Sequence, residues 1–188
     1  MSYKKSSSLL LLSFVSSLLF TTMTHAQLLD FTNPRIVNEM WVVNDGVMGG
    51  VSQSRISNDS EGAVFEGVVS LDNGGGFASV RSSIVIPAGT LALNVTIRGD
   101  EKRYKLVLRT DTSPRSPLYQ AEFFANREWK TYRFVSSDFK ASFRGRSVDA
   151  PALDFSATKE IGILIANQQS GSFRLQLKNV QSAVDAPR

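Results

Sequence analysis

The stretch Leu91-Ala92-Leu93-Asn94-Val95-Thr96-Ile97-Arg98 decides the fold class of this 188-residue chain. It has an apolar side chain at every second position, from Leu91 to Ile97. Strict alternation of this kind is typical of a β-strand that buries one of its faces. Because the pattern recurs at Tyr104–Leu108 and Phe173–Leu177, the sequence predicts half-buried strands in widely separated parts of the chain.

Less regular apolar runs extend this prediction over the rest of the chain. They are Ala63–Leu71, Phe77–Ile86, Leu118–Phe124, Trp129–Val135 and Ile161–Ala166. Turn-forming residues separate these runs, and no helical spacing of apolar residues lasts beyond about two turns. Only Ser156–Glu160 is expected to form a short helical turn. Strands roughly ten residues apart favour a single all-β domain, an antiparallel sandwich or a barrel.

The N-terminal residues 1–26 have the layout of a secretory signal peptide. Lys4 and Lys5 make a basic start, Leu9–Phe20 is an apolar centre broken only by serines, and Thr24-His25-Ala26 offers a cleavage site. The apolar centre is shorter than the roughly 20 residues that a membrane-spanning helix needs. Cleavage after Ala26 is therefore preferred over an uncleaved anchor.

These features predict an exported protein, periplasmic or secreted, with no stable membrane span after cleavage. The domain is expected to occupy residues 27–181, followed by a flexible polar tail at residues 182–188. The whole chain carries a net charge of +4, and removing two lysines with the leader would halve it. The pair of arginines around Gly145 is too short a basic patch for nucleic acid, so no nucleic-acid partner is predicted.

The amino-acid composition excludes several kinds of catalytic and metal site. The chain has no cysteine, and its single histidine, His25, would leave with the signal peptide. A Ser-His-Asp triad, a Cys-His pair and the usual zinc sites are then unavailable. No Asp-x-Asp-x-Asp-Gly loop favours calcium. The sequence predicts no catalytic residues, no metal and no cofactor.

A second informative stretch is Trp41-Val42-Val43-Asn44-Asp45-Gly46-Val47-Met48-Gly49-Gly50-Val51-Ser52. An apolar run ends in the turn signal Asn44-Asp45-Gly46, and a second signal, Gly49-Gly50, follows at once. Glycines are needed where the backbone takes positive φ or approaches another segment closely. This stretch is therefore expected to form a shaped, glycine-bounded loop.

This stretch resembles the signature of the complex I intermediate-associated protein 30 family. Two further blocks follow in the order of that family, Phe65-x-Gly67 with Asn73–Arg81, and Arg98-Gly99-Asp100 with Tyr104. Weaker similarities continue at Trp129, Phe143-Arg144-Gly145 and Gly171-x-Phe173. The resemblance covers about Leu29 to Val180, nearly all of the expected domain.

The resemblance implies a galactose-binding-like β-sandwich, a jelly roll that many carbohydrate-binding modules share. Mitochondrial members of the family are assembly factors for respiratory complex I, which act as chaperones rather than enzymes. Two departures limit this transfer. Glu101 stands where the family tends to have a glycine, and the leader looks secretory rather than mitochondrial.

The predicted binding surface joins the glycine-bounded loop to charged and aromatic residues of the later blocks. Its members are Trp41, Asn44, Asp45, Met48, Arg81, Arg98, Asp100 and Tyr104. Several have a simpler structural interpretation. Asp45 before a glycine more often accepts hydrogen bonds in its own turn, Trp41 more often lies in a core, and Met48 more often packs beneath its loop. Arg81, Arg98 and Asp100 are as well explained by ion pairs between strands.

Three function classes are compatible with these observations. The preferred one is a non-enzymatic module that recognises a protein partner through loops at one end of a sandwich. The second is a carbohydrate-binding module, with stacking residues among Trp41, Trp129, Tyr104 and Tyr119. The third is a glycosidase using two carboxylates about 5–9 Å apart. The candidates for that pair are Asp45, Glu66, Asp100 and Glu122.

Overall fold

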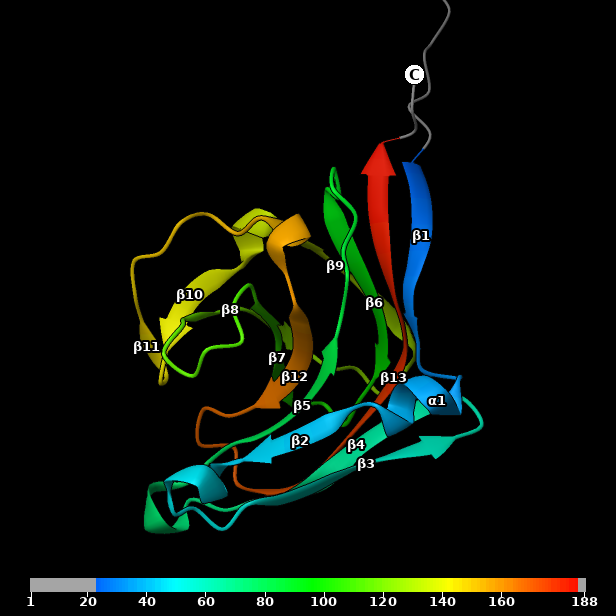
Figure 1. Cartoon of the computed structure of the whole chain (residues 1–188). Coiled ribbons are helices and arrows are strands. Elements are labelled where there is room, and N and C mark those ends of the chain that lie inside the picture. Colours follow the sequence, from blue (N-terminus) through cyan, green and yellow to red (C-terminus); the bar gives the residue numbers. More distant parts are fainter. Residues whose placement is uncertain (1–22, 186–188) are drawn as a thin grey trace, which may run out of the picture.

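Two antiparallel β-sheets pack face to face in the computed structural model, which describes residues 23–185 (Figure 1). Sheet A has the order β3-β4-β13-β6-β9, and β1 pairs with β13 beside this path. Its strands are β1 (Met23–Asp30), β3 (Gln53–Asp59), β4 (Gly62–Val69), β6 (Ala92–Arg98), β9 (Lys130–Val135) and β13 (Gly171–Asp185). The predicted all-β sandwich is confirmed.

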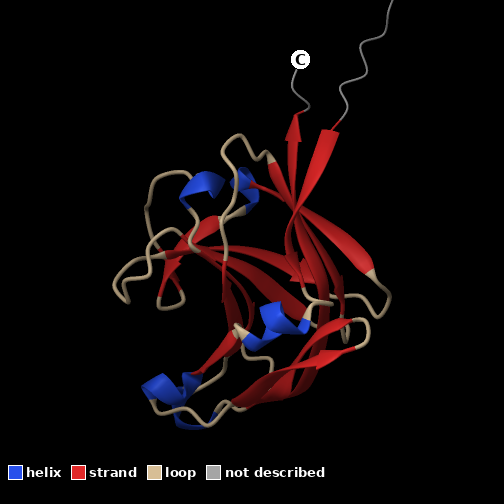
Figure 2. Ribbon diagram, turned by 45° about the vertical axis from the view of Figure 1, so that its right-hand side comes forward, coloured by secondary structure: helices blue, strands red, loops and turns tan. Residues whose placement is uncertain are grey.

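Sheet B has the order β11-β10-β8-β7-β12-β5-β2. Its strands are β2 (Trp41–Asn44), β5 (Ala78–Ser83), β7 (Arg103–Arg109), β8 (Leu118–Phe124), β10 (Lys140–Phe143), β11 (Arg146–Ser147) and β12 (Glu160–Ile165). The helical segments are short and lie at the ends and margins of the sheets (Figure 2). They are α1 (Pro34–Asn38) and the 3₁₀ turns η1 (Asp45–Met48), η2 (Asp72–Gly74), η3 (Ser136–Asp138) and η4 (Phe155–Ala157).

The alternating apolar residues build the core as predicted. In β6, Leu93, Val95 and Ile97 are buried between the sheets. Aromatic rings link the two layers, because Tyr104 of β7 packs edge-on against Phe173 of β13, with 6.5 Å between ring centroids. Period-two burial of this kind fixes the register of each strand, since a slip by one residue would turn its apolar face to water.

Strand β13 is the long central element of sheet A. Its first half pairs with β4, its second half pairs with β1, and β6 runs along its other side. Because β1 starts at Met23, it includes the last four residues of the predicted signal peptide, residues 23–26. The rest of that peptide, residues 1–22, lies outside the described residues.

The structure corrects the start of the predicted C-terminal tail. Strand β13 continues to Asp185, and Ser182 and Ala183 are fully buried. Pairing with both β1 and β6 holds these residues, although their small and polar side chains give no clear strand pattern. Residues 186–188 lie outside the described part of the chain.

Most of the strands that the sequence did not predict are at edges or have an irregular register, although β10 lies between β8 and β11. Strand β3 is the edge of sheet A, and among its residues only Ile56 is apolar. In β1 the pairing register shifts between Gln27 and Leu29, which breaks the alternation. The turn η4 overlaps the expected turn at Ser156–Glu160, but it starts one residue earlier and ends three residues earlier. No helix among residues 23–185 is long and apolar enough to cross a membrane.

Candidate functional site

The carboxylate of Asp45 is the centre of the glycine-bounded loop. Strand β2 ends at Asn44, and Asp45 is fully buried at the start of η1. Its Oδ1 accepts a hydrogen bond from the Ser52 amide at 2.9 Å, and its Oδ2 accepts from the Ser52 hydroxyl at 2.5 Å. The amides of Gly76 and Phe77 also donate to Oδ2, at 2.7 and 3.3 Å. One carboxylate therefore joins two glycine-rich loops, residues 44–52 and 70–77.

Glycines allow this close approach. A Cβ on Gly75 would lie 2.6 Å from Asp45 Oδ2, and a Cβ on Gly50 would overlap the Asp45 carboxyl group. Gly49 has a different role, because it ends η1 in the left-handed region at φ 91°. The glycines are thus needed for contact with Asp45 or for backbone conformation, and the structural interpretation of Asp45 holds.

The carboxylate of Asp45 stays ionised despite its burial. Burial alone would raise its pKa, but the hydrogen bonds from Ser52, Gly76 and Phe77 outweigh that effect and lower the pKa below its ordinary value. A buried anion with several donors is a strong local constraint on backbone position. It fixes both loops relative to each other.

Exposed apolar side chains lie on, and next to, the two loops that Asp45 joins. We call Met48, Val51, Val68 and Leu71 the apolar rim; Met48 is 63% exposed, and the other three are 43–50% exposed. Met48 does not pack beneath its loop, contrary to the simpler interpretation. The amide of Ser70 donates a hydrogen bond to the Ser52 hydroxyl at 3.0 Å. This bond fixes the backbone next to Leu71 relative to the loop that contains Asp45. The turns η1 and η2 lie side by side at the lower left of Figure 1, in cyan and green.

Trp41 and Arg81 form a second group, on the outer face of sheet B. They are direct partners in the β2–β5 pairing, and Trp41 is 36% exposed rather than in the core. Arg81 faces Glu160 at 3.8 Å, and Arg109 Nε lies 3.5 Å from the same carboxylate oxygen. Burial and the neighbouring Arg109 lower the pKa of Arg81, although Glu160 opposes this.

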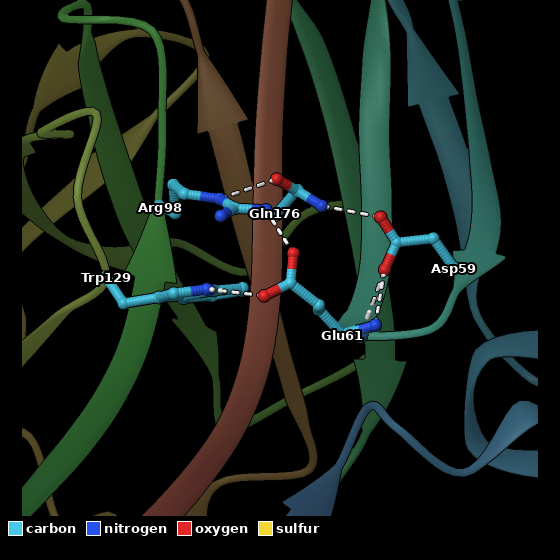
Figure 3. Close-up of polar contacts among 6 residues, drawn as sticks. Asp59, Glu61, Arg98, Trp129 and Gln176 are labelled. Carbon is cyan, nitrogen blue, oxygen red and sulfur yellow. Dashed lines mark hydrogen bonds and ion pairs between the residues drawn. The ribbon is translucent and has the colours of Figure 1, made fainter.

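Arg98 lies on the outer face of sheet A, away from both groups. Its Nε donates to Gln176 at 2.8 Å, and one Nη donates to Glu61 at 2.5 Å (Figure 3). Its guanidinium lies over the ring of Trp129, 4.8 Å from the centroid. The Trp129 indole also donates to Glu61 at 3.3 Å. Arg98 is therefore held in a network of hydrogen bonds within sheet A. This network joins β6, β13, the turn between β3 and β4, and the residue before β9.

Tyr104 and Asp100 are paired with each other. Tyr104 is fully buried, and its hydroxyl donates to Asp100 Oδ1 at 2.9 Å. Burial, and then the charge and hydrogen bond of Asp100, raise the pKa of Tyr104 well above its ordinary value. The other Asp100 oxygen accepts from the Arg174 amide at 2.9 Å. The structure thus distributes the eight predicted residues over separate places rather than one patch.

The carboxylates proposed for a glycosidase do not form an acid–base pair. Asp45 is enclosed by amides, and Glu122 lies on the opposite sheet from Glu66. Glu66 and Asp100 do line one groove of about 690 Å³ on sheet A. However, hydrogen bonds from Arg55 and Arg174 outweigh the effect of burial and lower the pKa of Glu66, whereas a general acid needs a raised pKa.

Sequence reasoning missed Val68 and Leu71 of the rim, and also the hydrogen bond between Ser70 and Ser52. Leu71 was assigned to the end of a strand, but β4 stops at Val69. The glycines at positions 74–76 were the only sequence signal for a loop near Leu71. Among residues 23–185 there is also no group of three or more His, Asp or Glu side chains placed to hold a metal ion.

The two packed sheets and the loops at their end define a jelly-roll β-sandwich of the galactose-binding-like class. The sequence profile of the complex I intermediate-associated protein 30 family matches residues 29–177, and the chain belongs to this family. The family resemblance noted in the sequence is confirmed. A comparison with curated protein sequences finds no significant match.

Solved structures with a similar fold include carbohydrate-binding modules. The family 11 module of the cellulosomal cellulase Lic26A-Cel5E of Clostridium thermocellum has a TM-score of 0.60 and 16% identity, with 88% of this chain and 97% of that chain covered. A structure of a family 11 module from the same organism, in complex with a β-1,3-1,4-mixed-linked tetrasaccharide, has a TM-score of 0.58, 16% identity and coverages of 86% and 97%. The agarase AgWH50C has a TM-score of 0.54 and 13% identity, with 87% of this chain and 25% of that chain covered. At these identities the likeness shows the fold alone.

Proposed function

We propose that this protein is a non-enzymatic binding module that recognises a protein partner through the apolar rim. One observation carries the proposal. Three exposed apolar side chains, Met48, Val51 and Leu71, are on loops that the buried Asp45 carboxylate fixes in position, and the fourth, Val68, lies near the end of β4, two residues before the second loop. Exposed apolar groups gathered at one place favour association with another molecule. Membership of a family described by association with a complex I intermediate points the same way.

Rigidity of the rim supports this function. Binding costs free energy when loops and side chains must be ordered, so loops that are already fixed bind more tightly. The hydrogen bonds of Asp45 and of Ser52 with Ser70 provide this order in the unbound protein. Met48 adds an adaptable contact, because its unbranched thioether side chain fits irregular surfaces.

The proposal includes export. The basic start, apolar centre and small-residue cleavage site of residues 1–26 support a role in the periplasm or outside the cell. A partner is then expected among envelope or secreted proteins rather than on the cytoplasmic side of the membrane.

The test compares two double variants in crosslinking and pull-down from envelope extract. Met48→Ser with Leu71→Ser removes the rim. Val85→Ser with Leu91→Ser is the matched control, because both residues are exposed and apolar but lie in the connection between β5 and β6. The rim variant is expected to lose a partner that the wild type and the control both retain. Equal capture by all three proteins, or by none, contradicts the proposal.

Carbohydrate binding is the second candidate function. Of its predicted stacking residues, Tyr104 and Tyr119 are buried in the core, and the Trp129 ring is already covered by Arg98 and Lys178. Trp41 favours this function nonetheless, because it is exposed on the outer face of sheet B beside Arg81. A glycan array probed with the wild type and with Trp41→Ala tests this function. If the wild type binds no glycan on the array, the carbohydrate-binding function is excluded.

A further inference from the structure

The pairing registers place one row of side chains across six strands of sheet B. Starting at the β2 edge, each member is the direct partner of the next. The row is Trp41, Arg81, Gly162, Val107, Gln120 and Lys140. Val42 pairs with the buried Val80, and Ala141 pairs with the buried Tyr119, so the row lies on the opposite, outer face. At about 4.8 Å per strand, it spans roughly 24 Å.

The row has large side chains at its ends and small ones at its centre. Trp41 and Arg81 stand at one end, and Gln120 and Lys140 at the other. Gly162 and Val107 between them are buried. A side chain at position 162 is restricted, because a Cβ there would meet the Val80 carbonyl oxygen at 2.5 Å. An extended ligand laid along the row would therefore meet an aromatic ring at one end and a cation at the other.

The outer face of sheet B has an excess of positive charge. Its strands direct five basic side chains outward against two acidic ones, Glu122 and Glu160. The basic residues are Arg81, Arg103, Lys105, Arg109 and Lys140. Arg103 pairs with Glu122, and Arg81 and Arg109 share Glu160, so among residues 23–185 Lys105 and Lys140 are the outward basic residues of this sheet without an acidic partner. The excess on sheet B favours a ligand that carries negative charge.

The ion pair between Arg81 and Glu160 is long and lacks a hydrogen bond. Its closest approach is 3.8 Å, and Arg81 Nε and Glu160 Oε2 are buried without a hydrogen-bond partner. An unmade hydrogen bond at a buried polar atom costs free energy. A surface ligand does not reach these two buried atoms, but a ligand hydroxyl or carboxylate can accept a hydrogen bond from the exposed part of Arg81. One fifth of the Arg81 side chain remains exposed to such a ligand.

We propose that the outer face of sheet B binds an acidic oligosaccharide laid across its strands from Trp41 to Lys140. This rests on the second candidate function and specifies its face, direction and charge. Trp41 stacks on one sugar ring, and Arg81 and Lys140 neutralise carboxylates farther along the chain. The hydroxyls of the sugar form hydrogen bonds with Gln120. The site shares no residue with the apolar rim.

Titration of the full-length protein with galacturonate and its oligomers of increasing length tests the proposal. Neutral galactose oligomers of the same lengths are the comparison. Affinity for the acidic series is expected to rise with length until the row is spanned, to exceed that for the neutral series, and to fall as salt is added. Equal binding of both series, or no gain beyond the monosaccharide, overturns the inference but leaves carbohydrate binding itself in place.

Paired variants locate the site. Trp41→Ala and Lys140→Glu are expected to weaken oligogalacturonate binding by about tenfold or more each. Trp129→Ala and Lys130→Glu are the matched controls on sheet A and are expected to bind as the wild type does. Loss of binding in the controls alone would move the site to sheet A and overturn the inference. If neither series binds at all, the second candidate function fails together with it.

A measurement on the wild type avoids any effect of the variants on folding. Amide shifts on adding the longest oligogalacturonate are expected in the six strands of the row, β2, β5, β12, β7, β8 and β10. Shifts confined to β3, β4 and β13 would contradict the proposed face.

Discussion

Oδ2 of Asp45 lies 2.7 Å from the backbone amide of Gly76, thirty-one residues further along the chain. This hydrogen bond joins the loop after β2 to the loop before β5. Both loops carry glycine-rich blocks of the family signature, and both meet at one buried carboxylate. The blocks are therefore parts of one structural unit, which holds the apolar rim in place.

We expect Asp45→Asn to lower the free energy of unfolding at neutral pH by about 3 kcal/mol, because an amide NH₂ would face backbone donors. Urea denaturation measures the change. Asp72→Asn is the control, since Asp72 is exposed in the neighbouring loop and its side chain accepts from Ser70. A similar loss in both variants would show that Asp45 has no special role.

The stabilising effect of Asp45 should depend on pH in a defined direction. Its folded-state pKa lies below the ordinary value of 3.8. The carboxylate therefore contributes its full stabilisation above about pH 3.8, and this is lost as the pH falls through the lower, folded-state pKa. The difference in unfolding free energy between wild type and Asp45→Asn is expected to narrow below pH 3.8. A constant difference from pH 7 to pH 2 would contradict the assignment.

Glycine substitutions separate steric contact from general loop flexibility. Gly50→Ala and Gly75→Ala place a methyl group against the Asp45 carboxylate, so each is expected to cost about 1–3 kcal/mol. Gly46→Ala is the matched control in the same turn, because a Cβ there meets nothing within 4 Å. Thermal melts of the three variants give the comparison. Equal melting temperatures would exclude the steric explanation.

The sequence predicted the strands well where one face is buried. Leu93, Val95 and Ile97 carry the alternation that their burial requires, and the same is true of β7 and β8. It failed for β3, because an edge strand with one apolar residue has no such requirement. The sandwich could be predicted from these patterns, together with the family resemblance.

The predicted site was less accessible to sequence reasoning. A local turn signal identified Asp45, but its contact with Gly76 depends on how two distant loops pack. Tyr104 and Asp100 were grouped with the loop although they form a separate buried pair. The exposure of Trp41 follows from its place on β2, the edge strand of sheet B. These contacts and the exposure of Trp41 depend on the order of the strands in the sheets. The residue pattern within a single segment does not determine that order.

Tyr104 should make stability fall at alkaline pH. Burial, with the charge and hydrogen bond of Asp100, raises its pKa above the ordinary value of 10.0. In the unfolded chain the phenol loses its proton near pH 10, whereas in the folded protein it keeps it, so stability decreases as the pH rises above that value. Tyr104→Phe has no ionisable group at this position. At neutral pH the variant is expected to lose about 1 kcal/mol with the hydrogen bond to Asp100, and above pH 10 its deficit should shrink. Urea denaturation of both proteins from pH 7 to pH 11 measures the two curves, and parallel curves would show that the Tyr104 hydroxyl ionises as readily in the folded protein as in the unfolded chain.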